Sequence, residues 1–320
     1  MSVNRHYRSS VLIFSACIRS QNKENGGRML KIMVHGLFLT LAWIGTAFGQ
    51  SGDGLKVFIS VDMEGVTGVV NVNDASRSGK DYDYFRQTMT REANAAIEGA
   101  LAAGATEIIV RDSHGSALNL LPEMLHRSSR LIRDWSGGPM SMMEGIDSSY
   151  DAAIYVGYHA RAGTPNGVLD HTSSGNVADV SINGISMPET GYNALMAGYY
   201  DVPVVFVAGD KAVCDQARAL LGNVETVAVK EGIGAAALNL HPEVARERIR
   251  AGVEKALQNL SDYQPYKLQA PYTMVLTLKT EQSIHEGAFY PGATRTGDWE
   301  LTYVAQDVME LMLAYRGMRR

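Results

Sequence analysis

The stretch Lys56-Val-Phe-Ile-Ser-Val-Asp62-Met-Glu64-Gly65 places two acids directly behind a run of apolar, β-branched residues. Such an uninterrupted apolar run is typical of a strand that is buried on both faces, as in a parallel sheet. Asp62 and Glu64 alternate with Met63, so on an extended backbone both carboxylates point to the same side. Two adjacent carboxylates repel each other unless a cation lies between them, although an isolated pair of this kind is more often solvated in a loop.

Further apolar runs follow this stretch, and they alternate with segments of helical pattern. The runs predicted as strands are 107–112, 152–157, 203–209 and 225–230, and the predicted helices are 84–103, 189–200, 211–221 and 242–257. This alternation predicts an α/β fold, with a mostly parallel sheet covered by helices on both faces.

The pattern changes after about residue 262. An alternating strand is expected at 272–280 and a closing helix at 304–315. We therefore expect a metal-binding catalytic α/β domain at 50–262 and a smaller C-terminal α+β section at 263–320. The sequence leaves open whether this section is a subdomain or an edge of the same sheet.

A histidine follows each of the predicted strands 107–112 and 152–157. The two segments are Asp112-Ser-His114-Gly115 and Gly157-Tyr-His159-Ala160. The carboxyl ends of parallel strands meet at one edge of a sheet, so these histidines should lie near the acids that follow the first strand. A lone histidine is more often structural. Three successive strand ends that carry an acidic pair, a histidine and a second histidine rarely arise by accident. Together they supply enough oxygen and nitrogen ligands for zinc.

Two further residues stay ambiguous on pattern alone. His171 follows Asp170 in a loop, where it is either a surface residue or an acid, base or oxyanion partner at the rim of the sheet. Glu189 has capping-box spacing from Ser186 at the start of a helix, which favours a structural role.

The charge of the chain is unevenly distributed. The formal net charge is −5, but the first 49 residues hold six basic residues and one acid, so the rest carries −10. A body this acidic excludes nucleic acid and an anionic membrane surface as expected partners.

Residues 29–49 have the pattern of a signal peptide. Met29 starts a short basic segment that contains Lys31, an apolar run fills 36–47, and the small residues Ala47 and Gly49 stand at the −3 and −1 positions. That run is shorter than the roughly 18 apolar residues of a membrane span. We expect cleavage after Gly49, export to the periplasm or secretion, no membrane attachment afterwards, and an upstream extension at 1–28. The alternative is an uncleaved anchor or a buried N-terminal helix.

Five segments resemble, in the same order, the motifs of the zinc-dependent D-aminopeptidases of the bacterial dipeptide-transport operon type. They are Ser60–Gly65, Asp112–Gly115, Gly157–Ala160, Leu169–Thr172 and Pro188–Asn193. The resemblance implies a catalytic His171 and a homodecamer that encloses its active sites. It also implies two zinc ions per chain, held by Asp62, Glu64, His114, His159 and Glu189. Pro188 departs from the family pattern, in which glycine is expected.

The resemblance implies an aminopeptidase that removes N-terminal D-residues, of the D-Ala type, from short peptides. The predicted signal peptide makes it an exported one, which departs from the best-known relatives, because those look cytoplasmic. Two zinc ions about 3.5–4 Å apart lower the pKa of a bridging water, which supplies hydroxide near neutral pH. The hydroxide would attack the scissile carbonyl, while His171 stabilises the oxyanion or protonates the leaving amine. Two alternatives remain: an L-aminopeptidase or small-amide hydrolase with the same site, and a non-catalytic metal- or peptide-binding protein.

Overall fold

The computed structural model describes residues 54–319, so the predicted upstream extension and signal peptide lie outside the described residues. The larger sheet has seven strands in the order β3-β2-β1-β4-β7-β8-β9, and all neighbours are parallel except β8 and β9. The expected mostly parallel sheet is confirmed. Its strands are β1 (Leu55–Val61), β2 (Ala105–Asp112), β3 (Ser129–Ile132), β4 (Ala152–Tyr158), β7 (Val204–Asp210), β8 (Glu225–Ile233) and β9 (Ala236–Asn239).

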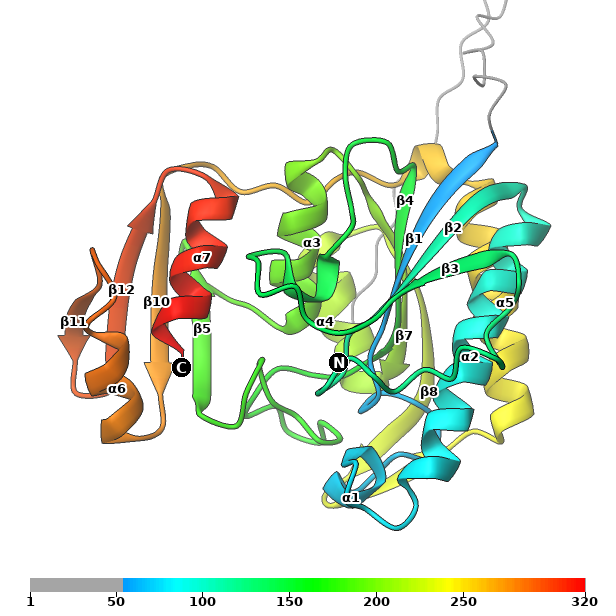
Figure 1. Cartoon of the computed structure of the whole chain (residues 1–320), viewed down its shortest axis with the longest axis horizontal. Helices are drawn as coiled ribbons and strands as arrows, with labels where there is room; N and C mark the ends of the chain where they lie inside the picture. Colours follow the sequence, from blue (N-terminus) through cyan, green and yellow to red (C-terminus); the bar gives the residue numbers. More distant parts are fainter. Residues whose placement is uncertain (1–53, 320) are drawn as a thin grey trace, which may run out of the picture. The chain divides into compact units, whose positions relative to one another are not determined.

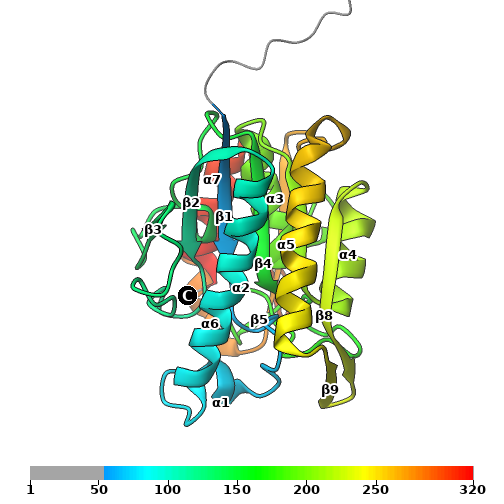
Figure 2. The same ribbon diagram turned by 90° about the vertical axis from the view of Figure 1, so that its right-hand side faces the viewer.

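Helices cover both faces of this sheet. α2 (Tyr82–Ala102) and α5 (Pro242–Gln258) lie side by side on one face (Figure 2), and α3 (Glu189–Tyr199) and α4 (Lys211–Leu221) lie on the other (Figure 1). The alternation of β1 matches this arrangement, because Ile59 packs with α2 and α5 whereas Phe58 packs with the opposite core. The described chain also contains the short helix α1 (Val72–Ala75) and the 3₁₀ helices η1 (Ser141–Met143) and η2 (Leu260–Asp262).

The C-terminal section contributes three strands to a second sheet, separate from the parallel one. This antiparallel sheet has the order β11-β12-β10-β5-β6 and carries α6 (Glu281–Gly287) and α7 (Val308–Met318). Two of its strands come from the middle of the chain, inside the span 50–262. The strands are β5 (Val177–Ile182), β6 (Ile185–Ser186), β10 (Tyr272–Leu278), β11 (Thr294–Gly297) and β12 (Glu300–Ala305).

The predicted start of the closing helix at residue 304 is wrong. Val304 lies in β12 and pairs with Thr273 of β10. The helix begins only after Asp307, whose side chain accepts a hydrogen bond from the backbone N–H of Glu310 and so caps α7.

The strand order of the parallel sheet reverses between β1 and β4, and there the loop after β1 crosses very close to β4. The backbone N–H of Asp62 donates to the carbonyl of Val156 at 2.8 Å, and the backbone N–H of Gly65 donates to the carbonyl of Gly157 at 2.7 Å. A Cβ on Gly65 would lie 1.8 Å from the carbonyl oxygen of Tyr158. Only glycine fits this crossing, because the obstacle is backbone that no rotamer change can move.

Gly65→Ala is therefore expected to destabilise the fold by about 3 kcal/mol, the upper part of the usual range for overpacking. Urea unfolding measures this change. Gly175→Ala is the matched control, because a Cβ there meets nothing within 4 Å. Equal unfolding midpoints for the two variants would contradict the close crossing.

Candidate metal centre

The candidate site lies at the point where the strand order of the parallel sheet reverses, at the carboxyl ends of β1, β2 and β4. Asp62 and Glu64 follow β1, His114 follows β2, and His159 follows β4. His114 Nδ1 is 2.8 Å from Glu64 Oε2 and 3.3 Å from Asp62 Oδ1, and His159 Nε2 is 3.5 Å from Asp62 Oδ2. The structure thus brings these four side chains together.

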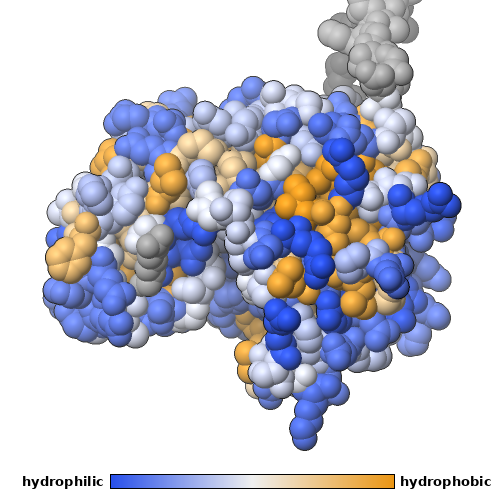
Figure 3. Space-filling view, in the orientation of Figure 1, coloured by the Kyte–Doolittle hydropathy of each residue, from blue (hydrophilic) through white to orange (hydrophobic). Residues whose placement is uncertain are grey.

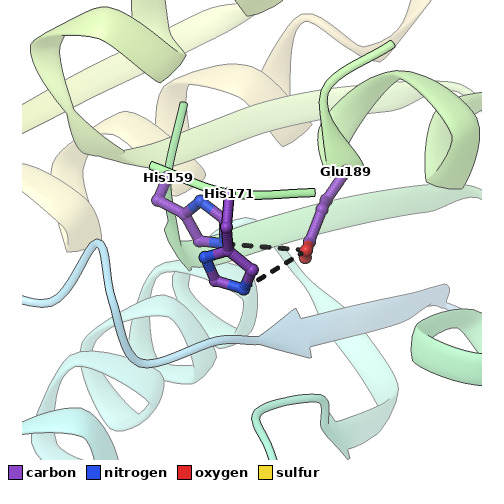
Figure 4. Close-up of side chains that lie close together, drawn as sticks. All are labelled: His159, His171 and Glu189. Carbon is purple, nitrogen blue, oxygen red and sulfur yellow. Dashed lines mark ion pairs between the residues drawn. The ribbon is translucent and has the colours of Figure 1, made fainter. Parts of the chain in front are cut away.

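His171 and Glu189 join the same cluster from more distant segments. Glu189 is the first residue of α3, and its Oε1 lies 3.7 Å from His159 Nε2 and 3.8 Å from His171 Nε2. Figure 4 shows both rings pointing toward this carboxylate. The two imidazoles are stacked with centroids 4.1 Å apart, and His171 Nε2 is also 4.0 Å from Glu64 Oε1.

The capping-box interpretation of Glu189 is wrong. Pro188 is the N-cap of α3 and Ser186 makes no capping bond, because its hydroxyl donates to Asp179 Oδ2 at 2.9 Å. The Glu189 carboxylate instead accepts the backbone N–H of Ser173 at 2.7 Å, which fixes its direction into the cluster.

Each histidine of the cluster has its second ring nitrogen against a backbone carbonyl. A carbonyl only accepts hydrogen bonds, so that second nitrogen carries the proton and the nitrogen facing the carboxylates has a lone pair when the ring is neutral. The same arrangement orients histidine ligands in metal sites. The contacts are His114 Nε2 to Ala75 at 2.9 Å, His159 Nδ1 to Ala160 at 3.0 Å and His171 Nδ1 to Leu169 at 3.0 Å.

The three carboxylates are buried close together, and their charges strongly affect one another. Burial and the neighbouring Glu64 hold the pKa of Asp62 well above its usual range. Burial would also raise the pKa of Glu64, but the surrounding histidines, led by His114, outweigh it and hold that pKa well below its usual value. Burial likewise opposes protonation of His114, yet Glu64 and Asp62 raise its pKa. The cluster therefore requires positive charge among its oxygens.

These residues fit a metal centre by their donor chemistry. His159 Nε2 is buried without a hydrogen-bond partner among residues 54–319, although it faces two carboxylates. The donors form two groups with ligand atoms within 4.8 Å of one another, and imidazoles with carboxylates are the ligands that zinc prefers. The groups are Asp62, Glu64 and His114, and His159, His171 and Glu189.

A cavity of about 320 Å³ opens above the cluster. Asp62, Glu64, His114, His171 and Glu189 line it, whereas His159 lies beneath. The side chain of His171 is 28% exposed and that of His159 is fully buried, so of the two stacked rings only His171 can touch a molecule in the cavity.

One important residue was missed in the sequence. Lys230, at the end of a buried stretch of β8, points its ammonium group at the loop after β1 and donates to the carbonyls of Glu64, Val66 and Val69. Burial lowers the pKa of Lys230 to about 8. Lysine is not a usual metal ligand, so it drew no attention, although a charged residue after the apolar run Val-Ala-Val was a detectable signal.

A buried acid supports the same loop from the helical side. Glu92 of α2 accepts the backbone N–H of Thr67 at 3.0 Å through Oε1, and its Oε2 has no hydrogen-bond partner among the described residues. Burial raises the pKa of Glu92 to about 7.

The raised pKa of Glu92 predicts a pH dependence of stability. The folded protein holds this proton more tightly than the unfolded chain, so the stabilisation is complete below pH 4.5 and is lost as the pH rises through 7. Glu92→Gln keeps a neutral acceptor for Thr67 at every pH. Relative to the wild type, the variant should gain up to about 3 kcal/mol between pH 4.5 and 8 in urea unfolding. A difference that stays constant over this range would contradict the buried proton.

The comparisons with known proteins agree with this fold and site. A solved structure, the zinc-dependent D-aminopeptidase DppA from Bacillus subtilis, a self-compartmentalizing protease, is similar with a TM-score of 0.80 and 35% identity. The match covers 82% of this chain and 96% of that one. The shared fold and the clustered donors define the class as metallo-aminopeptidase.

The sequence comparisons specify the family. The D-aminopeptidase family, peptidase M55, matches residues 55–316. A D-aminopeptidase from Bacillus subtilis (strain 168) is 38% identical over 270 residues, which cover 82% of this chain and 95% of that protein. The chain belongs to the D-aminopeptidase family, and the resemblance inferred from the five motifs is confirmed.

Proposed function

We propose that the protein is a dinuclear zinc aminopeptidase that removes N-terminal D-residues, of the D-Ala type, from short peptides. The observation that carries this proposal is the convergence of three carboxylates and three imidazoles at one cavity, with five of these side chains in its lining and His159 beneath it. The zinc dependence and D-aminopeptidase activity in the names of its relatives support the metal and the substrate class. A cavity of about 320 Å³ suits a small peptide better than a protein segment.

Five residues would hold the metal ions. Asp62 would contribute to both sites, because its Oδ1 faces His114 and its Oδ2 faces His159. Glu64 and His114 would complete one site, and His159 and Glu189 the other. Bound zinc supplies Lewis acidity, which lowers the pKa of water and polarises a carbonyl group.

His171 is the catalytic residue in this proposal. Its exposed ring lies at the cavity, and the carbonyl of Leu169 fixes a proton on Nδ1, so Nε2 is the atom that exchanges protons with a substrate. Burial opposes protonation, but Glu189 and Glu64 raise the pKa of His171. A protonated Nε2 can donate to the developing oxyanion and then pass its proton to the leaving amine.

The purified chain should contain two zinc ions and release D-Ala from D-Ala-D-Ala, with activity lost on chelation and restored by zinc. Metal analysis and an assay of released D-Ala measure both properties. Bound zinc with faster cleavage of L-Ala-L-Ala would make the enzyme an L-aminopeptidase. Absence of tightly bound metal after zinc loading would overturn the five-ligand assignment.

Two histidine variants separate the proposed roles. His159→Ala should lose activity together with the zinc of the site that His159 completes. His171→Ala should keep its zinc content, while its rate of D-Ala release falls by about a hundredfold or more, the usual size of a general acid–base contribution. His285→Ala, an exposed histidine of α6, is the matched control and should change neither property. Loss of zinc from His171→Ala would make His171 a ligand instead.

Export and assembly complete the proposal. Lys31 and the apolar run 36–47 support cleavage after Gly49 and a periplasmic or secreted mature chain, while no helix among residues 54–319 is long and apolar enough to cross a membrane. The self-compartmentalizing relative supports a ring-stacked homodecamer, and Figure 3 shows apolar side chains gathered over part of the viewed face, a feature suited to subunit contacts.

Exported protein should begin at Gln50 and have the native mass of ten mature chains. Intact-mass and native-mass measurements on the protein from a periplasmic or culture fraction test both points. An unprocessed chain retained in the cytosol would refute export, and a monomeric native mass would refute the decamer.

A further inference from the structure

The cavity above the metal centre is also lined by two basic side chains from the end of α7, the helix that packs on the second sheet. Arg316 and Arg319, from the end of α7, line the same cavity as Asp62, Glu64 and Glu189. The cavity therefore has an anionic, metal-binding floor and a cationic contribution from a separate element. Neither arginine was singled out in the sequence, since both read as ordinary basic residues at the end of a helix.

A short chain of contacts connects the two ends of the cavity. Glu189 accepts the backbone N–H of Ser173, and the hydroxyl of Ser173 contacts the Tyr192 hydroxyl at 2.8 Å and that of Tyr315 at 2.9 Å. The guanidinium of Arg319 lies over the Tyr315 ring, 5.5 Å from its centroid. Ser173 and Tyr315 thus connect the carboxylate end of the cavity to its arginine end.

Arg319 has an unsatisfied donor at this position. Its Nε is buried and has no hydrogen-bond partner among residues 54–319, and no carboxylate of the described chain forms an ion pair with it. A buried donor without a partner is costly, and a carboxylate is the acceptor that best matches the planar guanidinium. Arg316 adds a second positive charge, held in place by the bond from its Nη1 to the carbonyl of Gly138 at 2.5 Å.

We propose that Arg319, together with Arg316, binds the C-terminal carboxylate of the peptide substrate, so that the enzyme selects D-dipeptides with a free carboxylate. This inference rests on the proposed function and adds the substrate class. The metal centre takes the amino end and the scissile carbonyl of the dipeptide, and the arginines take the opposite end. A peptide amide lacks the negative charge that the guanidinium requires.

A purely structural role for these arginines makes a different prediction. Basic residues in the last turn of a helix offset the partial negative charge of its C-terminus. In that case, their replacement would lower the stability of α7 and would affect all substrates equally. The ratio between a free dipeptide and its amide separates the two roles.

The test compares the kcat/KM of zinc-loaded full-length protein for D-Ala-D-Ala and for D-Ala-D-Ala amide. The wild type should prefer the free carboxylate by about tenfold to a hundredfold, the range for one charge-assisted contact. Arg319→Ala should remove most of this preference by raising KM for the free dipeptide while leaving kcat and the amide nearly unchanged. Arg319→Lys should restore part of it, because the charge returns without the planar fork.

Arg295→Ala is the matched control. Arg295 is an exposed residue of β11 that pairs with Glu281 at 3.3 Å, so its loss removes the same charge from the second sheet outside the cavity lining. It should leave the preference unchanged. Thermal midpoint and zinc content establish that each variant is folded and loaded. If Arg319→Ala does not fold, Arg319→Gln and Arg319→Lys give the comparison.

The outcomes separate this inference from the proposed function. Release of D-Ala from both substrates with equal kcat/KM, or an unchanged preference in Arg319→Ala, would overturn carboxylate binding by Arg319 and leave the aminopeptidase intact. A wild type that releases no D-Ala from either substrate would overturn the proposed function, and this inference with it.

Discussion

Three carboxylates buried within a few ångströms of one another are the constraint on which the rest of the site depends. Asp62, Glu64 and Glu189 repel each other in a place where little water screens their charges. Positive charge has to compensate these carboxylates. A metal ion can supply it, and the three histidines can bind that ion through the lone pairs of their ring nitrogens. The cost of assembling the acids is thus the source of the metal affinity that we propose.

The backbone around the acids keeps them from separating. The loop after β1 is hydrogen bonded to β4 on one side. On the other side, the buried ammonium group of Lys230 donates hydrogen bonds to three carbonyls of this loop. Gly65 permits the close crossing that this geometry needs. The histidines are fixed by backbone carbonyls in the same way. A site built on strand ends and main-chain contacts is rigid before any metal arrives, which favours tight binding over adaptation.

Much of the fold and the cluster could be predicted because both follow from local patterns. The alternation of strands and helices indicates a parallel sheet, and such sheets bring strand ends such as those before Asp62 and His159 to one edge. The second sheet could not be predicted in full, since β5 joins β10 through pairs such as Val275 with Ser181, far apart in sequence. The position of Lys230 after Val-Ala-Val is visible in the sequence, but its three carbonyl partners are not. The place of Arg319 at the cavity likewise depends on tertiary packing, which no spacing encodes.

Ser173 shows why the second sheet belongs to the site and is not an appendage. Its backbone N–H holds Glu189, and its hydroxyl contacts Tyr192 of α3 and Tyr315 of α7. A single loop residue therefore connects a carboxylate of the metal centre to the helix that carries Arg319. Changes in α7 that keep Tyr315 in contact with Ser173 can therefore alter which peptide fits without disturbing the donors at the strand ends. The metal chemistry and the choice of substrate are in this way separable properties of one fold.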